Sequence, residues 1–313
     1  MLQAIPMMFG LVTLIFFLSR LLPGDPASLY VSPGVPPAVA EQLRSQFGLD
    51  RPLWAQYGGW FLSVLRGELG YSFAHAAPVR DVLLDVFPNT LLLGGTALVL
   101  ECLLAVALAA LALRCVGSWV DRFLSSFTLV VYSLPSFWVG ILLMFLFSFS
   151  LKIFPSSQMY SVDAKGQGGW VAGVDLMKHL ALPALTVAIP GAAAIARYLR
   201  TTISETLSQD YVVAAEGMGL SNAKVFRSYI LPNSLGPIVS LLGLEIGVLL
   251  TGVLVTETLF AWPGMGRIAV MAIFTRDYPM ILGCTLLGGA VVVAAIAVAD
   301  IIRAWIDPRI RLT

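Results

Sequence analysis

The stretch Asp210–Asn233, DYVVAAEGMGLSNAKVFRSYILPN, decides how the rest of the chain is interpreted. It lies between two long apolar runs, yet it is polar enough to stand in water and keeps small and apolar residues at helical spacing. Gly217 and Gly219 permit a tight turn in its middle. The stretch therefore predicts a short amphipathic segment that connects two membrane spans.

The second half of this stretch predicts a helix from Ser221 to Ile230. Its apolar residues fall at i, i+1, i+4 and i+5, which places four side chains on one helical face: Val225, Phe226, Tyr229 and Ile230. Ser221 is expected to cap the helix by accepting hydrogen bonds from its first free N–H groups. Pro232 is expected to end the helix.

The chain as a whole has the composition of a polytopic membrane protein. Of its 313 residues, 58% are hydrophobic and only 12% are charged, whereas soluble domains carry about 25% charged residues. Long apolar runs predict an all-α fold with six membrane spans, at about 5–22, 89–113, 123–151, 179–199, 235–259 and 280–302. The net charge of +1 does not indicate a nucleic-acid partner.

The longest polar segment is 23–88, between the first two predicted spans. Within it, Pro37–Phe47 and Pro52–Leu65 have helical character, and the second places an aromatic stripe on roughly one face: Trp54, Tyr57, Trp60 and Phe61. Such a stripe is more often core or interfacial belt than ligand site. We therefore expect 23–88 to pack as small helices outside the membrane.

The other connections and span ends carry fewer signals. Residues 152–178 have no clear period and are interpreted as a loop, and 260–279 as a short connection. Pro135 removes a helical hydrogen bond and is expected to kink the third span. Arg20 is expected to snorkel from the far end of the first span.

The opening stretch resembles a signature of ABC importer inner-membrane subunits: Glu-Ala-Ala, three residues, Gly, nine residues, then Ile-x-Leu-Pro. Five positions of this chain match it: Ala214, Ala215, Gly219, Leu231 and Pro232. Val213 stands at the Glu position and Tyr229 at the Ile position. The phrases LLPGDPA, FGLDRPLWAQY, GELGYSF, FAWPGMGRIAVMAIFTRDYP and DPRIR are similar to the dipeptide, oligopeptide and nickel permease branch of that family.

The resemblance implies a type I ABC importer permease fold, a single transmembrane domain over residues 1–313, with an extracytoplasmic helical insertion at 23–88 and a cytoplasmic coupling loop at 200–234. In that family the loop forms a coupling helix that docks in a groove of the ATPase subunit. The residues expected to serve this coupling are Asp210, Tyr211, Val213, Ala214, Ala215, Gly219, Ser221, Phe226, Leu231 and Pro232. Because Val213 stands where the family signature has Glu, no specific ion pair is expected at this position.

The resemblance also implies partners and a location. The chain is expected in the inner (cytoplasmic) membrane of a bacterium, paired with a second homologous permease subunit. Two cytoplasmic ATPase subunits, which bind the ATP and Mg, and an extracytoplasmic solute-binding protein complete the importer. The cargo implied is a peptide or a nickel or metal chelate, and FAWPGMGRIAVMAIFTRDYP is closest to nickel-type members.

Three carboxylates stand within or near the predicted spans, at Glu101, Glu245 and Glu257. Carboxylates at membrane depth are costly and face the protein interior or a pathway. Glu245 is expected to face a subunit interface or the translocation pathway. Glu101 is as well explained by a structural hydrogen bond between helices.

The distribution of basic residues favours a cytoplasmic location for the coupling loop. Leaving Arg20 aside, nine basic residues lie on each side of the membrane. Four of those on the far side belong to the long 23–88 segment, which the positive-inside rule discounts, leaving five against nine. This asymmetry is mild.

Sequence motifs for catalysis are missing. The chain has no G-x-x-x-x-G-K-[ST] loop for ATP phosphates and no H-E-x-x-H zinc motif. Its two histidines, His75 and His179, are too few for a His-based metal site, and nothing places Ser and Asp in a triad with them. The cysteines are expected to be small buried hydrophobes: Cys102, Cys115 and Cys284.

Two other functional classes stay open at this point. A self-sufficient ion-coupled secondary transporter would use the carboxylates in the spans, but such transporters often contain internal repeats, and none is evident here. An intramembrane enzyme would need a catalytic motif. A permease subunit that depends on separate ATPases accounts for more of the sequence than either.

Overall fold

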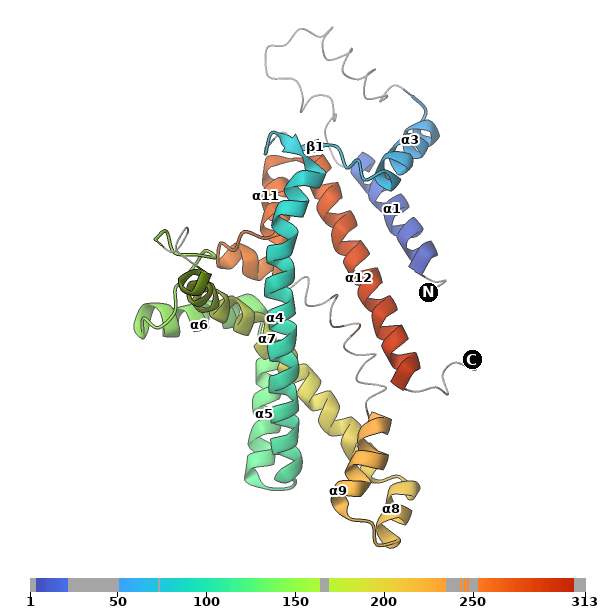
Figure 1. Ribbon diagram of the computed structural model, residues 1–313, viewed down its shortest axis with the longest axis vertical. Helices are drawn as coiled ribbons and strands as arrows, with labels where there is room; N and C mark the ends of the chain where they lie inside the picture. The colour runs from blue at the N-terminus through green and yellow to red at the C-terminus, as the bar shows by residue number, and fades with distance from the viewer. Residues whose placement is uncertain are drawn as a thin grey trace. The chain divides into compact units, whose positions relative to one another are not determined.

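The computed structural model describes residues 4–21, 51–72, 74–163, 169–234, 243, 245, 247 and 253–306. These residues are predominantly helical (Figure 1). The described part contains one small antiparallel hairpin, in which β1 (Tyr71–Ser72) pairs with β2 (Ala77–Pro78). The chain divides into two compact units, Met1–Pro88 with Ile268–Val293 and Asn89–Arg267 with Ala294–Thr313.

The described residues form helices in the following order along the chain. They are α1 (Ala4–Leu21), α3 (Leu53–Leu65), α4 (Val79–Arg114), α5 (Trp119–Ser133), α6 (Ser136–Leu143), the π-helix η2 (Met144–Ser150), α7 (Gly169–Leu207), α8 (Asp210–Gly217), α9 (Asn222–Val225), the π-helix η3 (Phe226–Ile230), α11 (Met265–Thr275) and α12 (Tyr278–Ile306). Residues 231–234 and 253–259 are also helical.

Several of these helices are apolar enough to cross a membrane. Among the described residues, α4, α7 and the Tyr278–Ile302 part of α12 each meet the length and hydropathy required, with mean hydropathies of 2.5, 1.6 and 2.5. Together α5 and α6–η2 form a further, bent pair. The first predicted span agrees closely with α1, whereas most of the fifth, 235–259, lies outside the described residues.

Several helices are longer than the spans predicted for them. Helix α4 begins at Val79, inside the segment predicted to be extracytoplasmic, and α7 extends from Gly169 to Leu207, well beyond 179–199. Residues 169–178 are therefore helix rather than loop, and α11 lies within what was predicted as a short connection. The reason is that hydropathy marks only the part of a helix suited to lipid, about 20 residues, while backbone hydrogen bonding continues past it.

Pro135 has a larger effect than the predicted kink. Leu134 and Pro135 are both extended, with ψ of 134° and 137°, because the residue before a proline avoids the α conformation. The helix therefore stops and restarts, and the two parts meet at 104°. Figure 1 shows α5 along the long axis and α6 across it. The interruption predicted in the third span, 123–151, is thus present at Pro135, and it is a break between two helices rather than a kink.

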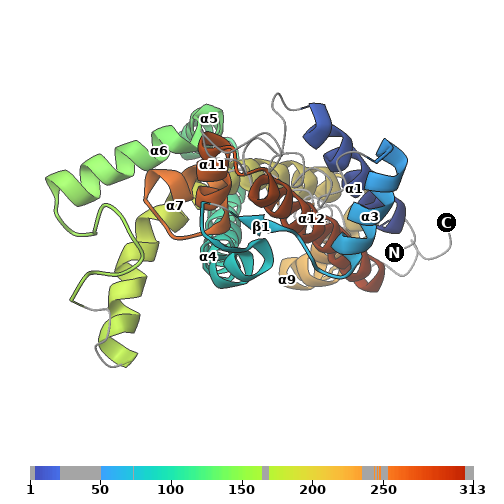
Figure 2. The same cartoon turned by 90° about the horizontal axis from the view of Figure 1, so that it is seen from above.

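The core of the larger unit lies along α7. Leu93 and Ala97 of α4 pack on Leu180 and Ala184, and further along, Ala105 and Ala109 pack on a row of small and branched α7 residues, Ala192, Ile195 and Ala196. Small side chains let two membrane helices approach closely enough for extensive van der Waals contact. Seen from above (Figure 2), α6 and the first turns of α7 extend away from α5.

The smaller unit is held by α1 and α3. Val12 and Ile15 of α1 pack with Leu286 and with aromatic residues of α3, and Thr13 Oγ1 lies 2.7 Å from the Tyr57 hydroxyl. The predicted aromatic stripe is confirmed for Tyr57, Trp60 and Phe61, but Trp54 is 77% exposed. The predicted helix Pro37–Phe47 and the Arg20 side chain lie outside what the structure describes.

Candidate functional site

The turn after α8 is a Schellman motif centred on Gly219. The Gly219 N–H donates to the Glu216 carbonyl at 2.9 Å, and the Leu220 N–H donates to the Ala215 carbonyl at 3.3 Å. Gly219 has φ of +76°, a left-handed conformation in which a glycine has no Cβ penalty. Of the two glycines predicted to form the turn, Gly219 provides it, and Gly217 is the last residue of α8.

Beyond this turn, the chain folds back on α8 and buries a small core. Ile203 of α7, Val212 and Ala215 of α8, Val225 of α9 and Ile230 of η3 form one buried cluster, with Leu113, Leu220 and Tyr229 packed on it. The cluster fastens the 210–234 segment to the ends of α7 and α4; Figure 1 shows α8 and α9 beyond the end of α7. Because the cluster is closely packed, a displacement of this segment would also displace the ends of α7 and α4.

The buried cluster separates the two alanines of the signature. Ala215 is fully buried, at 0% exposure, whereas Ala214 is exposed. Ala215 therefore packs within its own chain, and of the two alanines it is Ala214 that offers a surface to a partner. The spacing of alanines in the motif could not distinguish the two, because adjacent helical residues point about 100° apart.

The predicted helix after the turn begins as expected but has a different interior. Ser221 directly precedes α9, and its carbonyl accepts from the N–H groups of Lys224 and Val225 at 2.8 and 3.0 Å. These are backbone hydrogen bonds, so the cap expected from the Ser221 side chain stays a prediction. The helix then widens into η3, where the Leu231 N–H donates to the Phe226 carbonyl. In a π-turn, residues five apart align, so Val225 and Ile230 share the buried face while Phe226 is 41% exposed. Phe226 thus departs from the predicted apolar face.

Pro232 does not end the helix, contrary to expectation. Residues 231–234 remain helical, and the Asn233 side-chain amide donates to the Tyr229 carbonyl at 2.6 Å. The physical reason lies in η3, because the wide π-turn shifts the preceding carbonyls away from the position where a proline ring would clash with them.

The remaining predicted coupling residues form the outer surface of this segment. Tyr211, Val213, Phe226 and Leu231 are 40%, 58%, 41% and 37% exposed, and Asp210, Ala214, Gly219, Ser221 and Pro232 are exposed as well. Met218, at 71%, belongs to the same surface and was not predicted. The signal that could have identified Met218 is its position directly before Gly219, the glycine of the turn. The result is a largely apolar exposed surface above the buried cluster.

Of the three predicted pathway carboxylates, Glu101 and Glu245 lie close enough to interact electrostatically. Glu101 is 1% exposed, and its Oε1 has no hydrogen-bond partner within the described residues. Gly191 of α7 stands directly against this carboxylate, and a Cβ on Gly191 would overlap it. Glu245 is helical and half-buried. The expected hydrogen bond from Glu101 to another helix is not seen for Oε1 in the described part.

Glu257 has a different environment. It is fully buried, and its carboxylate accepts from Thr90 Oγ1 at 2.7 Å and from the Arg267 N–H at 3.0 Å. The Gly264 backbone lies so close that a Cβ there would overlap the carboxylate. A buried carboxylate with these partners holds the turn before α11 against the start of the second predicted span, which supports a structural role.

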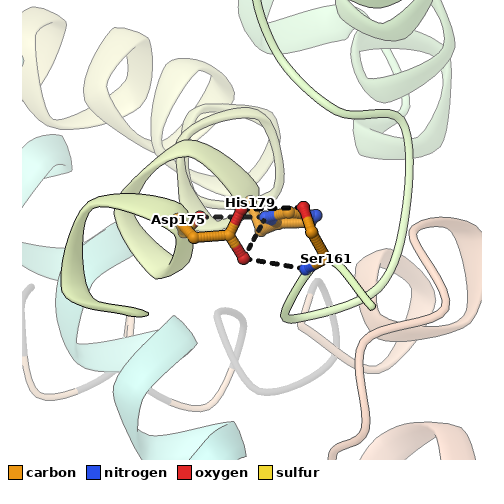
Figure 3. Close-up of polar contacts among 3 residues, drawn as sticks. All are labelled: Ser161, Asp175 and His179. Carbon is orange, nitrogen blue, oxygen red and sulfur yellow. Dashed lines mark hydrogen bonds and ion pairs between the residues drawn. The ribbon is translucent and has the colours of Figure 1, made fainter. Parts of the chain in front are cut away.

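Two Ser, Asp and His groupings come together, but neither has triad geometry. At the start of α7, Ser161 N and Oγ donate to the Asp175 carboxylate at 2.7 and 2.8 Å, and His179 Nδ1 lies 2.9 Å from the Asp175 carbonyl (Figure 3). In the second grouping Ser72 Oγ donates to Asp277 at 2.5 Å, with His75 Nδ1 at 3.1 Å.

In both groupings the histidine fails to bridge serine and aspartate, as a nucleophilic triad requires. His179 is buried with its Nδ1 at the Asp175 carbonyl, and the described part holds no group of three or more possible metal ligands. Of the cysteines, Cys284 is buried as expected, whereas Cys102 and Cys115 are half-buried.

The long apolar helices, the packed 210–234 segment and the buried membrane carboxylates define an α-helical membrane protein of the transporter class. Models of two families match the chain: the inner membrane component of binding-protein-dependent transport systems over residues 102–312, and the N-terminal part of such components over residues 1–94. The chain therefore belongs to the family of binding-protein-dependent transport system inner membrane components. It is a multi-pass permease of the inner membrane and not itself an enzyme; ATP is bound by a partner ATPase.

Curated relatives match along almost the whole chain. The probable D,D-dipeptide transport system permease protein of Escherichia coli strain K12 is 35% identical, with 96% of this chain and 93% of the relative covered. The oligopeptide transport system permease protein of Bacillus subtilis strain 168 is 31% identical, with 99% and 96% covered. Among solved structures, an inward-facing methionine ABC transporter, MetNI, matches with a TM-score of 0.55 at 15% identity, covering 72% of this chain and 96% of that one. That likeness supports the permease fold.

Proposed function

We propose that this permease imports short peptides. The support is the identity of 31–35% over nearly full length with permeases named for D,D-dipeptide and oligopeptide transport. A nickel or metal chelate, the other cargo suggested by FAWPGMGRIAVMAIFTRDYP, has no comparable support. Because cargo selection in such systems rests largely with the solute-binding protein, the permease is expected to provide a pathway suited to an extended, polar backbone.

We infer further that the permease crosses the membrane six times, with the 210–234 segment in the cytoplasm and residues 23–88 outside. Two ATPase subunits, a second homologous permease subunit and an extracytoplasmic solute-binding protein would complete the importer. This orientation is supported by the basic residues: nine lie on the proposed cytoplasmic side, against five on the other side outside 23–88.

The 210–234 segment is proposed to dock on the ATPase through its exposed apolar residues. The observation that carries this is the contrast between its two sides: Val213 and Met218 are 58% and 71% exposed, while Val212 and Ala215 beneath them are fully buried. An exposed apolar surface on a rigid base suits a contact that must transmit force. ATP-driven closure of the ATPases would move this surface and, through Ile203 and Leu113, the long helices behind it.

The experiment that tests the proposal is reconstitution of the complex in proteoliposomes. Uptake of a labelled dipeptide should require ATP, the ATPases and the solute-binding protein. Uptake driven by an ion gradient without the ATPases would contradict it. A single cysteine at Val213 should form a cross-link to the ATPase subunit, and one at Ser63 should be labelled from outside intact cells. Labelling of Ser63→Cys only from the cytoplasmic side would reverse the topology.

A further inference from the structure

A cavity of about 370 Å³ opens between α4, α5 and α7. We propose that it binds the phosphate of an anionic phospholipid in the cytoplasmic leaflet. Arg197 and Arg200 of α7 line the cavity together with Ser125 and Ser126 of α5. Guanidinium groups and hydroxyl groups in one cavity suit a phosphate, because both offer N–H or O–H groups to anionic oxygens.

The charges around the cavity are not balanced within the described part of the chain. Arg200 Nη2 donates to Asp121 Oδ2 at 2.9 Å, but the Arg200 Nε is buried and has no acceptor among the described residues. Arg197 is exposed and contacts no carboxylate in that same part of the structure. Arg122 also interacts electrostatically with Asp121, and it lies one helical turn before Ser125. Of the two guanidinium groups that line the cavity, only that of Arg200 is paired with a carboxylate, which leaves positive charge and a buried N–H donor without an acceptor in the described part.

Apart from Thr128 and Thr201, the rest of the cavity wall is apolar. Leu108 and Ala112 of α4 and Leu124 and Leu129 of α5 form this part of the wall. On the neighbouring surface of α5, Phe123, Phe127 and Val130 are 59%, 47% and 59% exposed. A basic, hydroxyl-bearing end next to an apolar surface fits an amphiphile better than a soluble anion, since the acyl chains gain a place to lie.

The level of the cavity in the bilayer suits a headgroup. Arg197 and Arg200 precede the end of α7 by about three and two helical turns, and α7 has 39 residues, about 58 Å. That length exceeds the hydrocarbon core of about 30 Å, so its last turns reach the headgroup region. The assignment to the cytoplasmic leaflet rests on the proposed orientation, and that leaflet carries the anionic lipids that attract basic residues.

The test measures lipid retained by the full chain purified with its partner subunits. The complex is equilibrated in detergent with equal amounts of phosphatidylglycerol and phosphatidylcholine and then examined by native mass spectrometry. Wild type should retain phosphatidylglycerol in preference. Arg197→Gln should lower this retention about fivefold or more, whereas Arg197→Lys, which keeps the charge, should retain most of it. Arg114→Gln, a matched loss of charge at the same membrane side but outside the cavity, should behave like wild type.

Four results would overturn the inference. Equal retention of the two lipids by wild type, or unchanged retention in Arg197→Gln, would remove the specific site. Displacement of the lipid by excess inorganic phosphate would identify a free-anion site instead. A photo-cross-linking amino acid at Leu129 that attaches to a protein subunit rather than to lipid would show that protein covers the cavity. ATP-driven peptide uptake, measured in the same preparations, keeps failure of this inference distinct from failure of the proposed function.

Discussion

Thr90 and Glu257, 167 residues apart in the sequence, share a buried hydrogen bond of 2.7 Å between Oγ1 and Oε1. The same Thr90 hydroxyl oxygen accepts from the Met265 N–H at 2.7 Å. Nearby, the Trp262 indole N–H donates to the Asn89 carbonyl at 3.0 Å. These contacts connect the start of one predicted span to the turn that precedes α11, within a single compact unit.

Replacement of Glu257 by glutamine should destabilise this turn. A carboxylate accepts with both oxygens, whereas an amide presents N–H groups at one of them, so either Thr90 or the Arg267 N–H loses its acceptor. The loss of a charged hydrogen bond in a buried site costs about 1.5–3 kcal/mol. The melting temperature of the purified complex should fall. The exposed Glu205→Gln is the control, and equal melting temperatures for the two variants would contradict the structural role of Glu257.

Valine at Gly219 should disturb coupling without preventing membrane insertion. Gly219 has φ of +76° and open space around it, so the only obstacle to a side chain is the left-handed backbone, which costs about 1–2 kcal/mol. Peptide uptake and stimulation of ATP hydrolysis by loaded binding protein should both decrease sharply. Gly217→Val is the matched control, because Gly217 also has open space but lies within a helix. Equal uptake by both variants would mean that the Schellman turn has no part in coupling.

Tryptophan at Ala214 and at Ala215 should act by different mechanisms. At Ala215 the large ring has no room in the buried cluster, and overpacking of this kind costs about 1–3 kcal/mol or more. The 210–234 segment should become sensitive to limited proteolysis.

At Ala214 the ring projects outward, so the segment should stay protease-resistant while the ATPase subunits co-purify less. If Ala214→Trp binds the ATPases as well as wild type does, the exposed surface is not the docking surface. Lys224→Ala, which removes one exposed charge, should have a mild effect.

Glu101 and Gly191 provide a direct test of helix packing between α4 and α7. Gly191→Ala should destabilise the complex because the new methyl group overlaps the Glu101 carboxylate. Combining it with Glu101→Ala removes the obstacle, so the double variant should be more stable than the sum of the two single changes implies. Thermal unfolding of the four proteins measures this coupling. Strict additivity would show that the two residues do not touch.

Much of the local structure could be predicted because it depends on local chemistry. Hydropathy identified α1, α4, α7 and α12 as apolar helices, and the glycines after α8 identified a tight turn. Helix ends were predicted less well, since hydropathy responds to lipid burial whereas hydrogen bonding carries α7 to Leu207. The π-turn before Pro232 was not foreseen, because a proline signal alone suggests termination.

The sequence by itself determined the class of protein, several of its long apolar helices and the place of the turn at Gly219, because apolar runs, glycine conformations and proline restrictions act over a few residues. Only the tertiary structure decided which alanine of the signature is buried, that Thr90 meets Glu257, and that Arg197 and Arg200 share a cavity with Ser125 and Ser126. Each of these contacts joins helices that are distant in the sequence, and each requires a helix to be rotated about its own axis by a particular angle. Helical periodicity does not determine that angle; packing against the neighbouring helix does.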